Sequence, residues 1–251
     1  MTPMSMLIAS GTLLMAAAAP MAAARAADPI KNIVLVHGAF ADGSGWQPVY
    51  ERLTKKGYSV SIVQEPETSL AEDVAATRRV IDMADGPVVL VGHSWGGQII
   101  TEAGADEKVK ALVYVAGLVP DVGESTSSLH ARIPAASKAV KEVSDGFLMI
   151  DPKDFHADFA ADLPKSQADF MAQSQVLVHK DALDTPAKAA SWKEKPTFGI
   201  VAKKDRTINP DLERWMYKRA NAKITEVDSS HVIMISHPDK VVAVIEEAAG
   251  K

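Results

Sequence analysis

Short apolar runs alternate with amphipathic stretches along most of the chain. Between the runs, apolar residues recur at helical spacing, most clearly over residues 70–83, 212–220 and 241–248. Continuous Val, Ile and Leu runs are typical of strands buried on both faces of a parallel sheet. We therefore expect an α/β fold with a mostly parallel, six-stranded sheet and helices on both faces. The expected strands are 32–37, 58–63, 88–92, 111–116, 197–202 and 223–227.

The alternation stops between Leu118 and Pro196. This stretch shows no strand pattern and is compatible with helix, but it is too apolar for a linker, and a long structureless loop inside a domain is unusual. We expect a helical insertion, over about residues 118–195, that folds over the site as a lid. Each of its apolar side chains fits an ordinary core equally well. The cluster comprises Phe147, Leu148, Met149, Phe155, Phe159, Phe170 and Met171.

The N-terminal segment has a different composition. Residues 4–24 are nearly all Ala, Leu, Met and Ile, and the small residues of Ala24-Arg25-Ala26 suit a signal peptidase. We predict a secretory signal peptide over residues 1–26, followed by one domain over residues 27–251, in the periplasm or outside the cell. The n-region has no Lys or Arg, so an uncleaved anchor is the alternative. No later apolar run is long enough to span a membrane.

The composition narrows the choice of partners. Of the 251 residues, 47% are hydrophobic and 24% charged, as in an ordinary globular domain, and the formal net charge is −5. An acidic balance disfavours nucleic acids and anionic membranes as partners. The chain has no cysteine, which excludes disulfides, thiolate metal sites and cysteine nucleophiles. Oligomeric state is open between monomer and homodimer.

The third apolar run leads directly into a Gly-x-Ser-x-Gly motif. Val88-Val-Leu-Val-Gly-His-Ser-Trp-Gly-Gly97 is a strand followed by Gly92-x-Ser94-x-Gly96 and then a helical stretch. A serine on such a strand-to-helix turn has a strained backbone and an exposed Oγ, and the glycines let the strand and helix approach closely. The motif alone is common, but its context predicts that Ser94 is a nucleophile.

A serine hydroxyl needs a general base and a group that orients this base. Of the seven histidines, His231 lies in a loop directly after the last strand, from where it can reach the strand ends. Asp205 ends Gly199-Ile-Val-Ala-Lys-Lys-Asp205, just past an apolar strand, which suits a buried carboxylate. Asp228 is the competitor, but three residues before His231 it is a better turn residue. The order Ser94, Asp205, His231 is that of the hydrolases with a nucleophile elbow.

Acyl transfer also needs two backbone N–H groups that point at the developing oxyanion. We expect one from Trp95, after the nucleophile, and one from Ala39, in the loop after the first strand, where Gly38 allows a close approach. Trp95 and an aromatic lid favour a small to medium apolar substrate group. The expected substrate contacts are Gly38, Phe40, Trp46, Phe147, Phe155 and Phe159.

Together these residues resemble the α/β-hydrolase superfamily. Val34-Leu-Val-His-Gly-Ala-Phe40 with Trp46, Val91-Gly-His-Ser-Trp-Gly-Gly97, Asp205 and His231 are similar to small bacterial hydrolases akin to plant methylesterases and hydroxynitrile lyases. The resemblance covers most of residues 32–249 and is loosest over 123–195. In the lyase branch a lysine follows the catalytic histidine and a threonine replaces the first-loop glycine. Val232 and Gly38 occupy those positions here, which favours ester hydrolysis.

The resemblance implies a two-step serine hydrolysis of a small-molecule ester, with no metal or organic cofactor. A nucleotide-binding domain is disfavoured, because neither glycine-rich loop has the G-x-G-x-x-G spacing and no P-loop is present. Two alternatives stay open. One is a cofactor-free haloperoxidase or perhydrolase with the same triad, and the other is a non-catalytic ligand-binding protein on a hydrolase scaffold.

Overall fold

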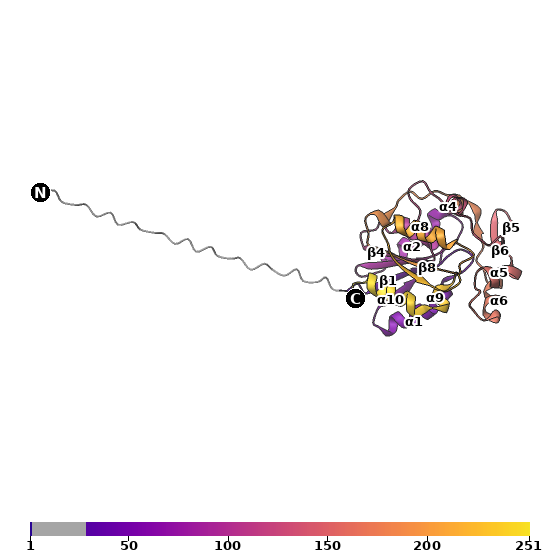
Figure 1. The fold of residues 1–251 in the computed structure, drawn as a ribbon, viewed down its shortest axis with the longest axis horizontal. Helices are drawn as coiled ribbons and strands as arrows, with labels where there is room; N and C mark the ends of the chain where they lie inside the picture. Colours follow the sequence, from indigo (N-terminus) through magenta and orange to yellow (C-terminus); the bar gives the residue numbers. More distant parts are fainter. Residues whose placement is uncertain (2–28) are drawn as a thin grey trace.

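A sheet of six parallel strands forms the middle layer of the protein (Figure 1). The structure is a computed structural model and describes Met1 and residues 29–251, so the predicted signal peptide, apart from Met1, lies outside the described residues. The strand order is β2-β1-β3-β4-β8-β9, and every pair of neighbours is parallel. The strands are β1 (Asn32–Val36), β2 (Ser59–Ile62), β3 (Val88–His93), β4 (Val109–Val115), β8 (Thr197–Ala202) and β9 (Lys223–Val227). The six predicted strands are therefore confirmed, with boundaries that differ by one or two residues at half of the strand ends.

Helices cover both faces of this sheet. Figure 1 shows α2 and α8 on one side of the strands and α1 and α10 on the other. Tyr114 of β4 contacts both Thr101 of α3 and Tyr217 of α8, so these two helices share a face. The helices outside the insertion are α1 (Gln47–Lys55), α2 (Leu70–Asp82), α3 (Gly96–Ala103), α8 (Pro210–Arg219), α9 (Ile233–Ser236) and α10 (Pro238–Ala248), with a short 3-10 helix η1 (Gly43–Trp46). The predicted α/β fold is confirmed.

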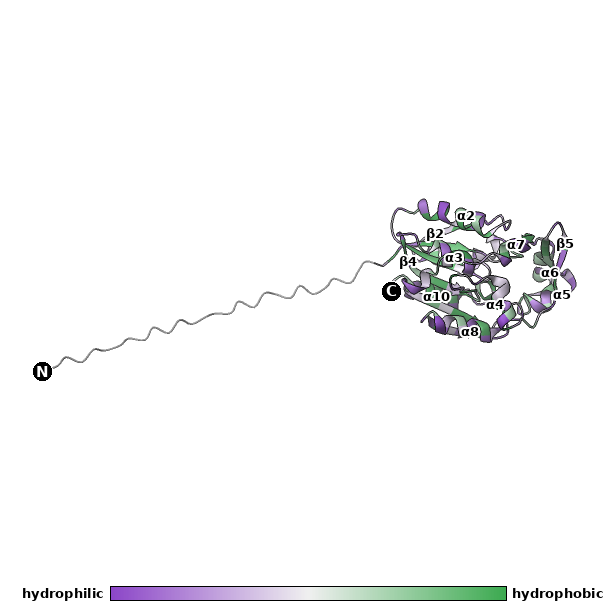
Figure 2. Cartoon of the chain, turned by 90° about the horizontal axis from the view of Figure 1, so that it is seen from above, coloured by the Kyte–Doolittle hydropathy of each residue, from purple (hydrophilic) through white to green (hydrophobic). Residues whose placement is uncertain are grey.

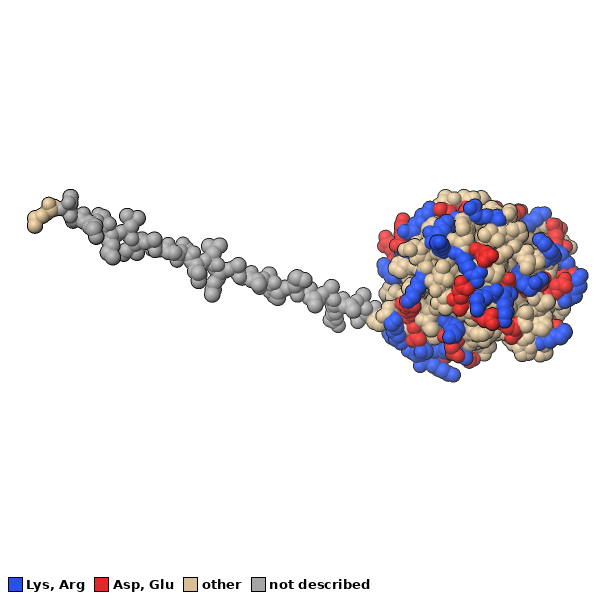
Figure 3. All heavy atoms as spheres, in the orientation of Figure 1, with Lys and Arg blue, Asp and Glu red and all other residues tan. Residues whose placement is uncertain are grey.

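The apolar runs form the core for the reason that their pattern predicts. Strands β1 and β3 are buried along their whole length, which is possible because helices cover both of their faces. Figure 2 shows hydrophobic strands between helices whose outer surfaces are hydrophilic. On the face drawn in Figure 3, acidic and basic side chains are interspersed without a large patch of one sign. Among the described residues, no helix is long and apolar enough to cross a membrane.

The insertion between β4 and β8 is a mixed cap and not purely helical. Its helices are α4 (Thr126–Arg132), α5 (Pro152–Asp158), α6 (Lys165–Gln173) and α7 (Lys180–Asp184), with the 3-10 helix η2 (Ser191–Lys193). Three strands, β5 (Val140–Ser144), β6 (Phe147–Ile150) and β7 (Val178–His179), form a separate antiparallel sheet. The expectation of helices is thus confirmed, and the expectation that this segment contains no strand is wrong.

The missed strands have a weak sequence signal. All five residues of β5 are exposed, so this strand lacks the buried run that identified the central strands. The hairpin between β5 and β6 turns at Asp145-Gly146, where φ is +51° and +84°. Asp-Gly is a preferred pair for a two-residue turn with both residues at positive φ. That dipeptide, with the short apolar run of β6 after it, is the local signal for the hairpin.

Candidate active site

Ser94 lies on a sharp turn between β3 and α3. Its φ of +53° is in the left-handed region, which an L-residue other than glycine rarely adopts. The turn is possible because strand and helix nearly touch: a Cβ on Gly92 would lie 2.5 Å from the carbonyl oxygen of Gly96. Such backbone strain at one serine, supported by glycine on both sides, is the geometry of a nucleophile elbow.

Asp205 holds one nitrogen of the His231 ring. Oδ2 of Asp205 lies 2.5 Å from Nδ1 of His231, and both side chains are fully buried. Oδ1 accepts hydrogen bonds from the backbone N–H groups of Thr207 at 2.7 Å and Ile208 at 2.9 Å, which fix the carboxyl plane. The competing acid, Asp228, is exposed and pairs with Lys204 at 3.0 Å.

His93 brings His231 next to the nucleophile. The ring of His93, the residue before Ser94, lies 4.6 Å from the ring of His231, and its Nε2 donates a hydrogen bond of 3.0 Å to the His231 carbonyl. Burial lowers the pKa of His93 well below its usual range, so this ring is neutral. His93 therefore supports the predicted base, a role that the sequence pattern did not indicate.

The ring nitrogen of His231 that faces away from Asp205 is free. Within the described part of the chain, Nε2 of His231 is buried and has no hydrogen-bond partner, and no hydrogen bond joins it to Ser94. Bonds between a catalytic serine and its base are often long without substrate and shorten when substrate binds. A buried imidazole with one nitrogen held by a carboxylate and the other free can accept a proton.

The insertion is hydrogen-bonded to the loop that carries His231. Oδ2 of Asp162, between α5 and α6, accepts hydrogen bonds from Ser229 Oγ at 2.7 Å and from Ser230 N at 3.0 Å. The two serines directly precede His231. The cap therefore fixes the loop that carries the predicted base, His231, a link for which the sequence held no signal.

Two residues with free backbone amides line the cavity beside Ser94. Ala39 and Trp95 both line the cavity that contains Ser94. Among the described residues, neither of their backbone N–H groups donates a hydrogen bond. A Cβ on Gly38 would lie 2.6 Å from Cβ of Ser94, so only glycine lets this loop come so close. Ala39 and Trp95 thus lie in the cavity wall beside Ser94, and their role as oxyanion donors stays a prediction.

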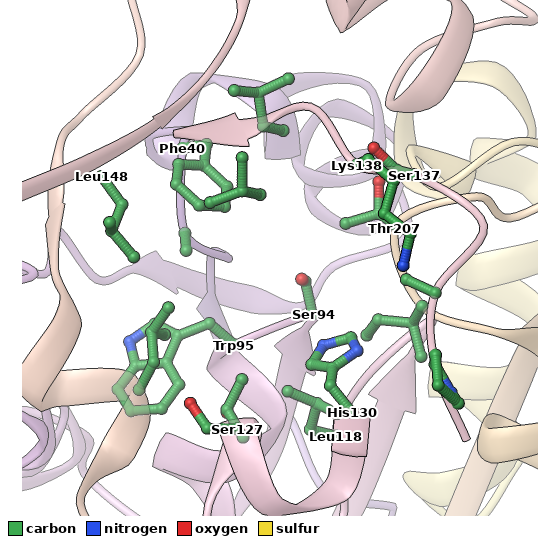
Figure 4. Close-up of a pocket in the computed structure, with 18 of the residues that line it drawn as sticks. Phe40, Ser94, Trp95, Leu118, Ser127, His130, Ser137, Lys138, Leu148 and Thr207 are labelled. Atoms are coloured by element: carbon green, nitrogen blue, oxygen red, sulfur yellow. The ribbon is translucent and has the colours of Figure 1, made fainter. Parts of the chain in front are cut away.

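The cavity over Ser94 has a volume of about 480 Å³ (Figure 4). Most of its wall is apolar and comes from the core and from the cap. The apolar wall includes Phe40, Leu118, Leu148, Ile150, Leu183 and Ile208, and the polar part includes Ser127, His130, Lys138 and Thr207. Burial lowers the pKa of His130, so this side chain adds a neutral imidazole to the polar part of the wall.

The structure separates the predicted substrate contacts into two groups. Phe40 lines the cavity, and Gly38 lies directly under Ser94. The other four aromatic residues do not line this cavity; they pack around the histidines and one another. Edge-on contacts join Trp46 to His93, Phe159 to His231 and Phe147 to His179, while Phe155 packs against Phe159 in a tilted arrangement.

Sequence reasoning assigned no definite role in the wall to Leu118, His130 or Thr207. Leu118 and Thr207 follow β4 and Asp205 closely, so the rule that sites lie beyond strand ends points to them. His130 lies on α4, and no local pattern gives its position. Among the described residues, no group of three or more His, Asp or Glu side chains is arranged to hold a metal ion.

Comparison with known proteins gives a consistent result. Residues 33–244 match the model of the alpha/beta hydrolase family. The alpha/beta hydrolase nvfD of Aspergillus novofumigatus is 30% identical over 242 residues, which cover 87% of this chain and 96% of that protein. Methylesterase 3 of Arabidopsis thaliana is 26% identical over 88% of this chain and 97% of its own length. A solved structure of the pyrethroid hydrolase PytH superposes with a TM-score of 0.77 at 20% identity, covering 88% of this chain and 98% of that one.

Proposed function

Because this chain belongs to the α/β-hydrolase family and is an esterase-like hydrolase, we propose that it cleaves carboxylic esters through Ser94, His231 and Asp205. The observation that carries the proposal is the buried Asp205–His231 pair, whose imidazole lies 4.6 Å from the ring of His93, the residue before Ser94. Ser94 itself has a φ of +53° and lines an apolar cavity. This arrangement contains a nucleophile, a base and a group that orients the base.

The proposed reaction has two halves. Nε2 of His231 takes the proton of Ser94 Oγ while Oγ attacks the ester carbonyl, and the N–H groups of Ala39 and Trp95 hold the oxyanion. The C–O bond to the alcohol then breaks, and His231 gives its proton to the leaving oxygen. Water, deprotonated by His231, attacks the acyl-enzyme in the same way and releases the acid and free Ser94.

The cavity supports esters of small to medium size. A volume of about 480 Å³ is in the range of pockets that bind small molecules, and its wall is mainly apolar. Several relatives are named for esterase activity, among them methylesterases of Arabidopsis thaliana and a carbendazim hydrolyzing esterase of Nocardioides. We propose an uncharged ester with one apolar group, accommodated between Phe40, Leu148 and Ile208.

Turnover of p-nitrophenyl acetate and butyrate tests this function. We expect hydrolysis by the wild type, and a decrease of at least about 1,000-fold for Ser94→Ala, because the nucleophile is lost. Ser174→Ala, on the exposed end of α6, is the matched control and should keep wild-type activity. Equal activity of Ser94→Ala and wild type, or no turnover by folded wild type, contradicts the proposal and favours a ligand-binding role.

We also propose that the protein is exported and cleaved after Ala26, on the composition of residues 1–26 alone. N-terminal sequencing of the protein from a cell fraction tests this. A new N-terminus at Ala27 in the periplasm or medium is the expected result. Full-length protein that stays with the membrane supports the anchor instead.

A further inference from the structure

A buried chain of hydrogen bonds lies behind the proposed oxyanion hole and includes acids that the reaction does not use. These acids lie in or after the loop between β2 and α2. Glu65, Glu67 and Asp73 are 5%, 0% and 0% exposed, although buried carboxyl groups are costly unless they are bonded. Their partners are therefore informative.

Asp73 joins two segments that are far apart in the sequence. Its Oδ2 accepts a hydrogen bond from the indole Nε1 of Trp95 at 3.0 Å, and its Oδ1 accepts one from the backbone N–H of Glu67 at 2.9 Å. Trp95 carries one of the two proposed oxyanion amides on its backbone. Asp73 thus fixes the side chain of the residue whose main chain holds the oxyanion.

Glu67 holds the loop that carries the other amide. Its Oε2 accepts a hydrogen bond from Phe40 N at 3.4 Å, and its backbone carbonyl accepts one of 2.8 Å from His179 in the cap. Both Phe40 and Glu67 have left-handed backbones, with φ of +66° and +56°. Strained non-glycine residues persist only where the surroundings determine them strongly.

His37 sets the direction of the Ala39 amide. Its Nδ1 donates a hydrogen bond of 3.0 Å to the carbonyl oxygen of Gly38, while its Nε2 contacts the carboxyl group of Glu65. The Gly38 carbonyl and the Ala39 N–H belong to one trans peptide unit, so they point in opposite directions. With the carbonyl held by His37, the N–H of Ala39 faces away from that bond, in a loop that approaches Ser94 so closely that a Cβ on Gly38 would lie 2.6 Å from Ser94 Cβ.

We propose that Asp73 and Glu67 are positioning residues that fix both oxyanion amides by joining the Gly38–Phe40 loop to Trp95 through one buried hydrogen-bonded chain. This inference rests on the proposed function, since it assigns a purpose to amides that the reaction requires. Amides held in advance at the position of the developing charge need no reorganisation during the reaction. Loss of the chain should therefore affect kcat more than KM.

The charge state of Asp73 gives a readout that a purely structural role would not change. Burial raises the pKa of Asp73 to about 6, against the opposing effect of its bonds from Trp95 and Glu67 N. The titratable groups that face it are Glu65, Glu67 and His37. When Asp73 takes up a proton, the protonated oxygen becomes a hydrogen-bond donor and faces another donor, either the indole of Trp95 or the amide of Glu67. One of these two hydrogen bonds is then lost.

Asp73→Asn tests the hydrogen-bonded chain, because Asn, like a protonated Asp, has only one acceptor oxygen free for the two donors. At pH 8 we expect kcat to fall about 10-fold to 100-fold with KM changed less than threefold. The ratio of wild-type to variant kcat should shrink at least threefold at pH 5, where wild-type Asp73 is protonated. Glu72→Gln, on the exposed side of α2, is the control and should match wild type.

Trp95→Phe adds a second, independent variant, because it removes the indole N–H and keeps the backbone N–H. If Asp73 acts through Trp95, the double variant should lose less than the product of the two single losses. Two results together overturn the inference. The ratio of wild-type to Asp73→Asn kcat does not change with pH, and the kcat loss of the double variant equals the product of the two single losses.

Hydrogen exchange separates this inference from the proposed function. In Asp73→Asn we expect faster amide exchange in residues 37–41 and 94–96, with the rest of the chain unchanged, whether or not the ester substrate is right. Unchanged exchange in these two segments overturns the chain even if Ser94 is catalytic. Failure of the proposed function would instead appear as equal turnover by wild type and Ser94→Ala.

Discussion

Nδ1 of His231 lies 2.5 Å from Oδ2 of Asp205, and both side chains are buried. A hydrogen bond to a carboxylate keeps the proton of a neutral imidazole on Nδ1 and leaves Nε2 free. Nε2 has no partner among the described residues, as the proposed role of His231 as the base for Ser94 requires. This relationship underlies the first prediction.

Asp205→Asn should lower kcat for p-nitrophenyl butyrate by about 10,000-fold with little change in fold. The amide is of equal size, but it favours the wrong tautomer of His231, as comparable changes in serine hydrolases show. The measurement is steady-state kinetics with a circular dichroism spectrum. Asp228→Asn is the matched control, because Asp228 is exposed and pairs with Lys204. Greater loss in Asp228→Asn than in Asp205→Asn would reverse the assignment of the acid.

Gly38→Ala should abolish most activity. The new Cβ would lie 2.6 Å from Cβ of Ser94, so the loop with the Ala39 amide must move away. Displacement of one oxyanion donor lowers kcat about 100-fold or more. Gly45→Ala is the control, since its Cβ meets its nearest neighbour at an ordinary 3.6 Å. If kinetics show Gly38→Ala to be as active as Gly45→Ala, the Ala39 amide is not an oxyanion donor.

Leu148→Ala should shift the substrate preference towards longer esters. Leu148 lies on β6 and forms part of the apolar wall, so its truncation lengthens the cavity. We expect the ratio of kcat/KM for p-nitrophenyl hexanoate to that for acetate to rise about tenfold. Leu177→Ala, at an exposed leucine of the cap outside this wall, is the comparison. The same ratio in both variants would place the acyl group elsewhere.

The free energy of unfolding of Glu67→Gln should increase relative to that of the wild type as the pH rises. Burial, with the charges of Asp73 and Glu65, raises the pKa of Glu67 well above its usual range. A folded state that keeps a proton which the unfolded chain has lost becomes less stable as pH rises between the two pKa values. Gln has no proton to lose. Urea unfolding at pH 5 and pH 8.5 measures this; a difference in unfolding free energy that stays constant would contradict it.

The sequence predicted the central sheet because its strands are buried on both faces and appear as uninterrupted apolar runs. Exposed β5 and the two-residue β7 have no such run, and only Asp145-Gly146, with the short apolar run of β6 after it, marked the hairpin. Ser94, Asp205 and His231 could be proposed because each follows a strand, where local order constrains position.

The cavity wall was harder to predict, because aromatic residues occur both in hydrophobic cores and in the walls of pockets. Trp46 and Phe159 pack on His93 and His231, so they support the site without lining it. His130 lines the cavity because the fold of the cap places α4 over it, and no local sequence pattern indicates that placement. The bonds from Asp73 to Trp95 and Glu67 also depend on tertiary structure.

Covalent labelling of the serine tests the central claim most directly. The full-length or mature protein is treated with a p-nitrophenyl phosphonate ester, and its intact mass and peptide map are recorded beside those of Ser94→Ala. The account predicts one phosphonyl adduct per chain, located on Ser94, release of one equivalent of p-nitrophenol, and no adduct in the variant. An adduct on another residue, or none on folded wild-type protein, would contradict the assignment of Ser94 as the nucleophile.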